Sequence, residues 1–159
     1  MNWFVRNVRD MKWWKRGPGG FVTEFVDGDA QVGVNLFVLE PGDKMAMYHW
    51  EADQEGFLVL SGEALLIVDE EEHPLRQWDY FHKPAGVSHT IVGAGSGPAA
   101  ILALGAREHQ HGPDWGAYPH SDVAMKHDAS TEEETTDPDV AYARFPDRGG
   151  AEFNEGWLP

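Results

Sequence analysis

Runs of apolar, β-branched and aromatic residues recur at short intervals through the middle of the chain. Turn-forming stretches such as Pro41-Gly42-Asp43 separate them. Regularly spaced runs of this length are typical of the strands of an all-β sandwich or barrel. Because the turns are short, we expect antiparallel neighbours joined by hairpins, with Ser61-Gly62 as one of these turns. The predicted strands cover 31–39, 44–50, 55–60, 63–69, 73–83, 88–93 and 98–105.

The two ends of the chain lack this pattern. Both ends carry many aromatic side chains, which is unusual for a disordered tail. Two short helices are expected toward the C-terminus, near 121–129 and near 138–144, where Asp137-Pro138 is typical of a helix start. We predict three parts, namely an N-terminal extension over 1–28, a β-domain over 29–106, and a C-terminal extension over 107–159 that wraps the β-domain or a partner subunit.

Composition narrows the classes of protein that fit. The 159 residues, of which 42% are hydrophobic, suit one globular domain with a sizeable core. Acidic residues outnumber basic ones by 27 to 12, for a net charge of −15. Such a surface repels nucleic acid and anionic lipid. No apolar run reaches the roughly 18 residues of a membrane span, and the first residues do not resemble a signal peptide. The chain has no cysteine, so we expect a cytoplasmic protein without disulfides.

Candidate metal-binding chemistry lies in two clusters. In the first, alternate residues of the expected strand share one face, so Met45, Met47, His49 and Glu51 point the same way. Glu55 opens the next strand after a brief turn, and its side chain can return beside them.

In the second cluster, Pro84 and Gly86 fix a turn, and His89 begins another strand. Imidazole and carboxylate groups together form a ligand set for manganese, iron, nickel or zinc.

At these positions the sequence resembles the cupin family. Gly42, His49-Trp50-Glu51, Glu55 and Gly62 are similar to the first cupin motif, and Pro84-x-Gly86-x-x-His89 resembles the core of the second. The resemblance covers residues 30–106. It implies a single antiparallel β-barrel of the jelly-roll, or double-stranded β-helix, type with one divalent metal ion. By the same resemblance, His49, Glu55 and His89 are metal ligands.

The sequence departs from the family pattern at Glu51, which stands where the first motif has a second His. Glu51 therefore carries over as a ligand by position only, and it can equally be a surface carboxylate at a strand end. A carboxylate in the ligand set favours manganese or iron over copper, while zinc and nickel remain compatible. Four protein ligands would leave open positions on a six-coordinate ion, which is typical of a catalytic site.

An apolar pocket is expected beside the ligands. Met45, Met47, Phe57 and Val59 share faces with them and would line it, although the same residues are equally explained as core. His82 either points into the barrel near the metal or packs as an ordinary side chain. Few basic residues fall within the predicted strands, so we expect a small, partly apolar ligand rather than a strongly anionic one.

Two functions fit these features. The first is an enzyme that uses one divalent metal ion on a small oxygen-chelating substrate. Dioxygenases, isomerases and lyases such as decarboxylases all occur in the family that the sequence resembles. The second is a non-catalytic barrel that binds or senses a small molecule, with a structural metal or none. Edge strands that need cover and the aromatic-rich ends also predict a homodimer.

Overall fold

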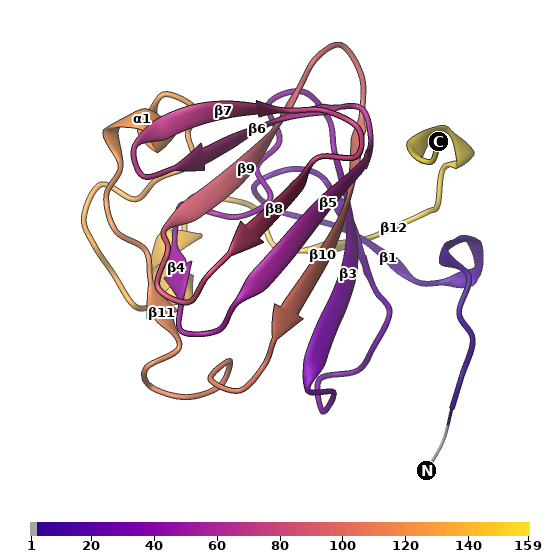
Figure 1. Cartoon of the computed structure of the whole chain (residues 1–159), viewed down its shortest axis with the longest axis horizontal. Coiled ribbons are helices and arrows are strands. Elements are labelled where there is room, and N and C mark those ends of the chain that lie inside the picture. The colour runs from indigo at the N-terminus through magenta and orange to yellow at the C-terminus, as the bar shows by residue number, and fades with distance from the viewer. Residues whose placement is uncertain (1–2) are drawn as a thin grey trace.

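The structure, a computed structural model, describes residues 3–159 and is built mainly of β-strands (Figure 1). Seven strands form a large sheet in the order β12-β1-β2-β3-β10-β5-β8, and three form a small sheet in the order β7-β6-β9. A two-stranded sheet joins β11 to β4. The strands are β1 (Trp13–Lys15), β2 (Phe21–Glu24), β3 (Val32–Leu39), β4 (Trp50–Glu51), β5 (Glu55–Ser61), β6 (Glu63–Val68), β7 (Glu71–Leu75), β8 (Tyr80–Lys83), β9 (His89–Ala94), β10 (Ala99–Ala106), β11 (Gly116–Ala117) and β12 (Gly149–Ala151).

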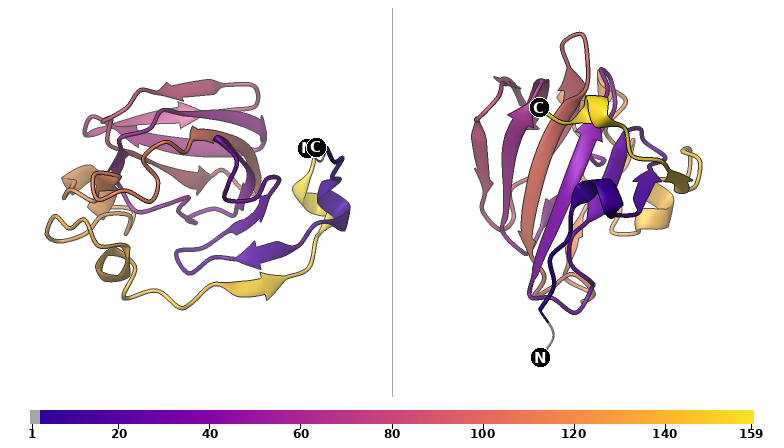
Figure 2. Two further views of the ribbon diagram at one scale, coloured as in Figure 1. Left: turned by 90° about the horizontal axis from the view of Figure 1, so that it is seen from below. Right: turned by 90° about the vertical axis from the view of Figure 1, so that its right-hand side faces the viewer.

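The large and small sheets face one another, and the main hydrophobic core lies between them (Figure 2). Phe57 and Ile101 come from the large sheet, and Leu66 and Ile91 come from the small one. The all-β prediction is confirmed. Within residues 3–159, however, no hydrogen-bonded ladder joins the two sheets, so the closed barrel is not confirmed.

The turn at Gly62 differs from the predicted hairpin. Strand β5 pairs with β10 and β8, whereas β6 pairs with β7 and β9, so the chain crosses from one sheet to the other at this point. Gly62 has φ of +76°, and a Cβ atom there would lie 2.4 Å from the carbonyl oxygen of Pro98. A turn within one sheet and a crossing between facing sheets use the same residue types, so sequence alone did not separate them.

The run 44–50 is not the continuous strand that was predicted. Only single bridges tie it to β9, at Lys44 and at His49. Between them the main-chain N–H of Tyr48 donates to the carbonyl of Ala129 in the C-terminal part of the chain, at 2.6 Å. The bend interrupts the alternation of faces. As a result, Met47 packs beside Tyr118 rather than in the core between the sheets.

Both ends of the chain add to the large sheet. Strands β1 and β2 continue it beyond β3, and β12 pairs with β1 at its edge (Figure 1). The Trp13 ring lies 5.0 Å from that of Trp157, and the pair belongs to a second apolar cluster with Leu36 and Val38 of β3. The segments at both ends of the chain are therefore packed on the large sheet, whose strand β5 carries Glu55.

The helical segments are short. They are η1 (Val8–Asp10), α1 (Asp122–Met125), α2 (Pro138–Ala141) and η2 (Glu155–Trp157). Helix α2 begins where Asp137-Pro138 predicted, and the Asp137 carboxylate accepts a hydrogen bond from the N–H of Asp139 at 2.9 Å.

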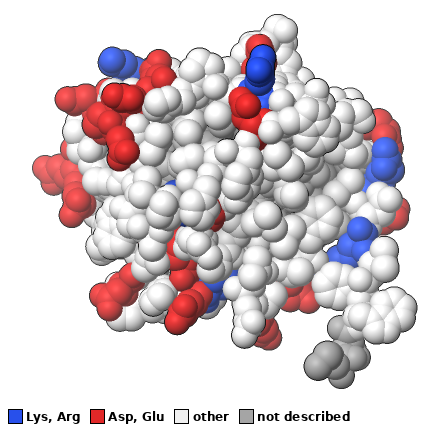
Figure 3. All heavy atoms as spheres, in the orientation of Figure 1, with Lys and Arg blue, Asp and Glu red and all other residues white. Residues whose placement is uncertain are grey.

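In the part of the chain that the structure describes, no helix is long and apolar enough to span a membrane. Acidic side chains gather at the left and lower margins of the face in Figure 3.

Candidate metal centre

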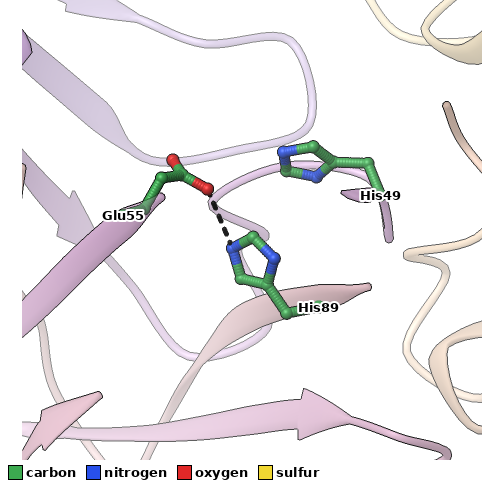
Figure 4. Close-up of side chains that lie close together, drawn as sticks. All are labelled: His49, Glu55 and His89. Atoms are coloured by element: carbon green, nitrogen blue, oxygen red, sulfur yellow. Dashed lines mark ion pairs between the residues drawn. The ribbon is translucent and has the colours of Figure 1, made fainter. Parts of the chain in front are cut away.

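Three of the predicted ligands lie together. His49 ends the bent segment before β4, Glu55 is the first residue of β5, and His89 is the first residue of β9. His49 and His89 exchange two main-chain hydrogen bonds, of 3.1 and 2.9 Å, which hold the two imidazoles beside each other. One ligand atom from each of the three side chains lies within 4.8 Å of the others. Figure 4 shows the three side chains converging from separate segments.

Glu51, the fourth predicted ligand, lies next to this group but is not part of it. Its Oε1 lies 3.1 Å from Nε2 of His49, and its side chain is 30% exposed. His49 Nδ1 lies 2.7 Å from the carbonyl oxygen of Met47, which can only accept, so Nδ1 carries a hydrogen. The contact between Nε2 and Glu51 then needs a second proton between those two atoms. A cation at Nε2 would take the place of that proton.

Lys83 is a charged group that the ligand prediction missed. Its side chain is fully buried, and Nζ lies 3.2 Å from Oε2 of Glu55. Nζ also donates to the carbonyl oxygen of Asp53, at 2.9 Å. The available signal was the alternation along β8, because Phe81 and Lys83 face inward together. Their neighbour His82 is exposed and lies outside the cavity at the three clustered side chains, which favours the second of the two placements considered for it.

The ionisable side chains of the site have pKa values that are shifted in different directions. Burial raises the pKa of Glu55, and the neighbouring Glu51 carboxylate raises it further. Burial also opposes ionisation of Glu51, but its hydrogen bond to His49 and the charges of His49 and Lys83 prevail, so the pKa of Glu51 is lowered. Burial, with the charges of His49 and Lys83, holds the pKa of His89 well below its usual range. His89 is therefore neutral at neutral pH, as a metal ligand must be.

The residues fit a bound cation. His89 Nε2 and Glu55 Oε2 are 3.7 Å apart, which is too far for a hydrogen bond. Glu55 Oε2 is buried with the Lys83 ammonium 3.2 Å away as its ion-pair partner, but among the described residues no group completes a hydrogen bond to this oxygen or to the buried Nδ1 of His89. Buried polar atoms without partners are rare in proteins. Two imidazoles and a carboxylate are ligands that manganese, iron, zinc and nickel accept.

A cavity of about 240 Å³ opens beside the three side chains. Strand register explains the space, because Gly33 of β3 and Gly105 of β10 lie in line with Glu55 of β5 and leave its side chain room. The next row inward is Asn35, Ala103 and Phe57. Of the predicted apolar lining, Met45 and Phe57 reach the cavity, while Met47 and Val59 are buried elsewhere.

Two arginines also line the cavity, and sequence reasoning had missed them as site residues. Arg16 lies just after β1, and Arg107 lies just after β10, so neither falls within a strand. Gly33 makes room for Arg107, because a Cβ atom there would lie 2.8 Å from the guanidinium Nε. The small number of basic residues within the strands therefore understates the positive charge at the cavity.

A second group of possible ligands lies at Asp53, Glu108 and His109. There the Asp53 carboxylate accepts hydrogen bonds from both the main-chain N–H and Nδ1 of His109, each at 2.8 Å. These two hydrogen bonds join the segment at Asp53 to the segment at His109, and they explain why the three side chains lie together without a metal ion.

Acid should destabilise the metal-free protein through His89. The unfolded chain has a histidine pKa of about 6.5, whereas the folded pKa is well below it. As pH falls through this window, only the unfolded state takes up the proton, so stability falls with pH. In chelator, wild type should lose up to about 1.4 kcal/mol more per pH unit than His89→Gln. Urea unfolding across the window measures this. His73→Gln, at an exposed position, should keep the wild-type slope, and equal slopes for all three would contradict the prediction.

The comparison with protein families gives one match, in which residues 35–105 correspond to the family described as "Cupin domain". The matched segment begins in β3 and ends in β10, and it contains all three clustered side chains. Residues 35–105, slightly under half of the 159-residue chain, are therefore similar to the cupin domain family. The comparison with curated proteins gave no match.

Several solved structures share the fold. A cupin-superfamily sugar phosphate isomerase from Silicibacter pomeroyi is 27% identical, with a TM-score of 0.62 over 73% of this chain and 80% of that one. A protein from Acidithiobacillus ferrooxidans, provisionally named a sugar phosphate isomerase, is 26% identical, with a TM-score of 0.54 over 57% of this chain and 61% of that one. A predicted oxalate decarboxylase from Thermotoga maritima has a TM-score of 0.59 at 18% identity, over 65% of this chain and 98% of that one.

Proposed function

We propose that this protein is an enzyme that uses one divalent metal ion to act on a small, oxygen-chelating organic substrate. The observation that carries the proposal is the convergence of His49, Glu55 and His89 beside a cavity, with their ligand atoms within 4.8 Å of one another. The two structures at 26% and 27% identity carry the name sugar phosphate isomerase, which supports an isomerase among the candidate activities. We also propose that the facing sheets serve as the cupin barrel around this site.

His49, Glu55 and His89 would hold the ion, and Glu51, which contacts His49 Nε2 in this structure, would contribute only weakly to binding it. The bound ion would polarise a substrate oxygen as a Lewis acid. Around it, the hydrogen bond from His49 Nδ1 to the Met47 carbonyl fixes the ring and leaves Nε2 toward the site. Lys83 fixes the Glu55 carboxylate from behind. Phe57 and Met45 keep that wall of the cavity apolar.

Lys83 also supports a second candidate, a binding module without metal. Its buried ammonium already neutralises Glu55 at 3.2 Å, so the pocket can stay folded without an ion. In that case the cavity would bind a small molecule and catalyse nothing.

Metal content and turnover test these two functions. Protein purified without a His-tag or chelator should contain near-stoichiometric metal, and His49→Ala and His89→Ala should lose it. Exposed His73→Ala is the matched control. The metal-loaded protein is then incubated with aldose phosphates and with oxalate, and products are followed by proton NMR and carbon dioxide release. Wild-type protein that stays folded and takes up no manganese, iron, zinc or nickel would rule out the enzyme proposed here and leave the binding module.

We further propose a cytoplasmic homodimer and keep the three-part division at residues 28 and 106. Val32, Tyr80 and Leu104 are exposed apolar side chains that line one shallow depression beside β8, the edge strand of the large sheet. Exposed apolar surface at a sheet edge favours pairing with a second copy. Light scattering after size exclusion gives the mass, and a monomer would exclude the dimer.

A further inference from the structure

We propose that the cavity recognises an oxyanion, a carboxylate or phosphate group of its ligand, through the guanidinium of Arg16. The inference deepens the proposed function, on which it rests for placing the rest of the ligand at His49, Glu55 and His89. It assigns a substrate class to a pocket whose sequence had suggested a less polar ligand.

The local structure holds the Arg16 guanidinium at the cavity wall. Nη1 donates to the main-chain carbonyls of Lys44 and Met45. The guanidinium carbon lies 5.2 Å from the centre of the Phe37 ring, and both Phe37 and Met45 line the cavity. These two main-chain bonds come from one nitrogen, and the Tyr142 hydroxyl is a further polar neighbour of the guanidinium, so the fork of five N–H donors is only partly used. The remaining donors suit the two oxygens of a carboxylate or phosphate.

The charge of Arg16 lacks an acidic partner. Four other arginines form ion pairs with carboxylates near the surface, whereas Arg16 forms none with any residue of 3–159. This is unexpected in a chain with a net charge of −15. Burial lowers the pKa of Arg16, which reflects the cost of keeping the cation away from water. A buried charge without a partner is costly, and an anionic ligand would supply the missing partner.

Two further groups extend the polar wall. The Arg107 guanidinium lies over Gly33 at the same cavity. The Asn35 side chain lines the row between them, and its buried Oδ1 has no hydrogen-bond partner within the described chain. That oxygen can accept a hydrogen bond from a ligand hydroxyl. With a divalent cation bound, the positive charges of the cation, Lys83 and the two arginines would exceed the negative charges of Glu51 and Glu55. The site would then carry a net positive charge.

The size of the cavity restricts the ligand. A volume of about 240 Å³ is below the roughly 300–1,000 Å³ of typical pockets for small-molecule ligands. The enclosed part of the ligand is therefore small. An oxyanion for Arg16, a hydroxyl for Asn35 and a chelating oxygen for the metal group together describe a short hydroxy or keto acid, or a small phosphorylated polyol.

Calorimetric titration of the manganese-loaded protein tests this assignment. The probes are oxalate and glycolate for carboxylates, glycerol 3-phosphate and inorganic phosphate for phosphates, and uncharged glycerol as reference. Arg16→Gln should bind the preferred anion about tenfold to a hundredfold more weakly, and Arg16→Lys should fall between it and wild type. Exposed Arg76→Gln removes the same charge away from the cavity and should match wild type. The preferred probe class separates carboxylate from phosphate.

Metal content and melting temperature, measured on the same samples, separate this inference from the proposed function. Wild type that takes up no metal but binds anions through Arg16 would uphold the inference and overturn the enzyme. Metal-loaded protein whose anion affinity is the same in wild type and Arg16→Gln would overturn the inference alone. Wild type that binds none of the four anions would also overturn it. Arg16→Lys, which keeps the positive charge, provides the comparison if Arg16→Gln melts at a lower temperature than wild type.

Discussion

Glu55→Gln should weaken metal binding by more than a hundredfold, whereas Glu51→Gln should weaken it only about tenfold. Losing a group outside the ligand shell commonly costs about 10-fold to 100-fold in metal affinity, and a ligand should cost more. Glu55 has an oxygen in the three-residue group, but Glu51 contacts His49 instead. Both substitutions replace a carboxylate with a carboxamide of nearly the same size, so they remove the negative charge with little change in packing.

Competition with a chromophoric chelator measures these affinities for manganese and zinc. Glu108→Gln is the matched control, because it removes an exposed carboxylate from the other ligand group. It should leave the affinity unchanged. Equal losses at Glu51 and Glu55 would mean that Glu51 turns from His49 to become a full ligand, and a larger loss at Glu51 would contradict the three-residue site.

Lys83→Met should destabilise the metal-free protein by about 3–5 kcal/mol, the usual cost of removing one partner from a buried ion pair. The ammonium is fully buried and lies 3.2 Å from Oε2 of Glu55, whose side chain is only 16% exposed. Methionine fills a similar volume but leaves the carboxylate without its cation. Metal should restore much of the loss, because a divalent ion supplies the missing positive charge.

A double-mutant cycle isolates this pair. Urea unfolding is measured in chelator for Lys83→Met, Glu55→Gln and the combination. The combined variant should be more stable than the sum of the single losses predicts, because it buries no unpaired charge. Lys126→Met, at an exposed position, should unfold like wild type. Additive losses would show that Lys83 acts mainly through its hydrogen bond to the Asp53 carbonyl.

Much of the fold was readable from the sequence because local patterns decide it. Alternating apolar runs bounded by Gly and Pro predicted β3, β5, β6, β9 and β10 to within about two residues. The Asp137-Pro138 pair gave the start of α2. His49, Glu55 and His89 were brought together by their resemblance to cupin motifs, and they lie together in the structure.

The remaining features depend on long-range contacts. The bond from Tyr48 to Ala129 bends the run 44–50 and turns Met47 away from the cavity. After Gly62 the chain enters the small sheet because β6 pairs with β7 and β9, and the turn residues alone do not specify this. Arg16 comes from a turn far from the motifs in sequence, so no local spacing links it to them. Lys83 could have been found from its register with Glu55, but only once β5 and β8 were paired.

The pairing of Trp13 with Trp157 has a consequence for synthesis of the chain. The two rings pack together although nearly the whole sequence separates them. Contacts between distant positions slow folding, since the intervening chain must be ordered before they form. Strand β1 cannot gain its β12 partner until Gly149–Ala151 leave the ribosome. Until then Trp13 stays uncovered, and the nascent protein depends on its central sheets for protection against aggregation.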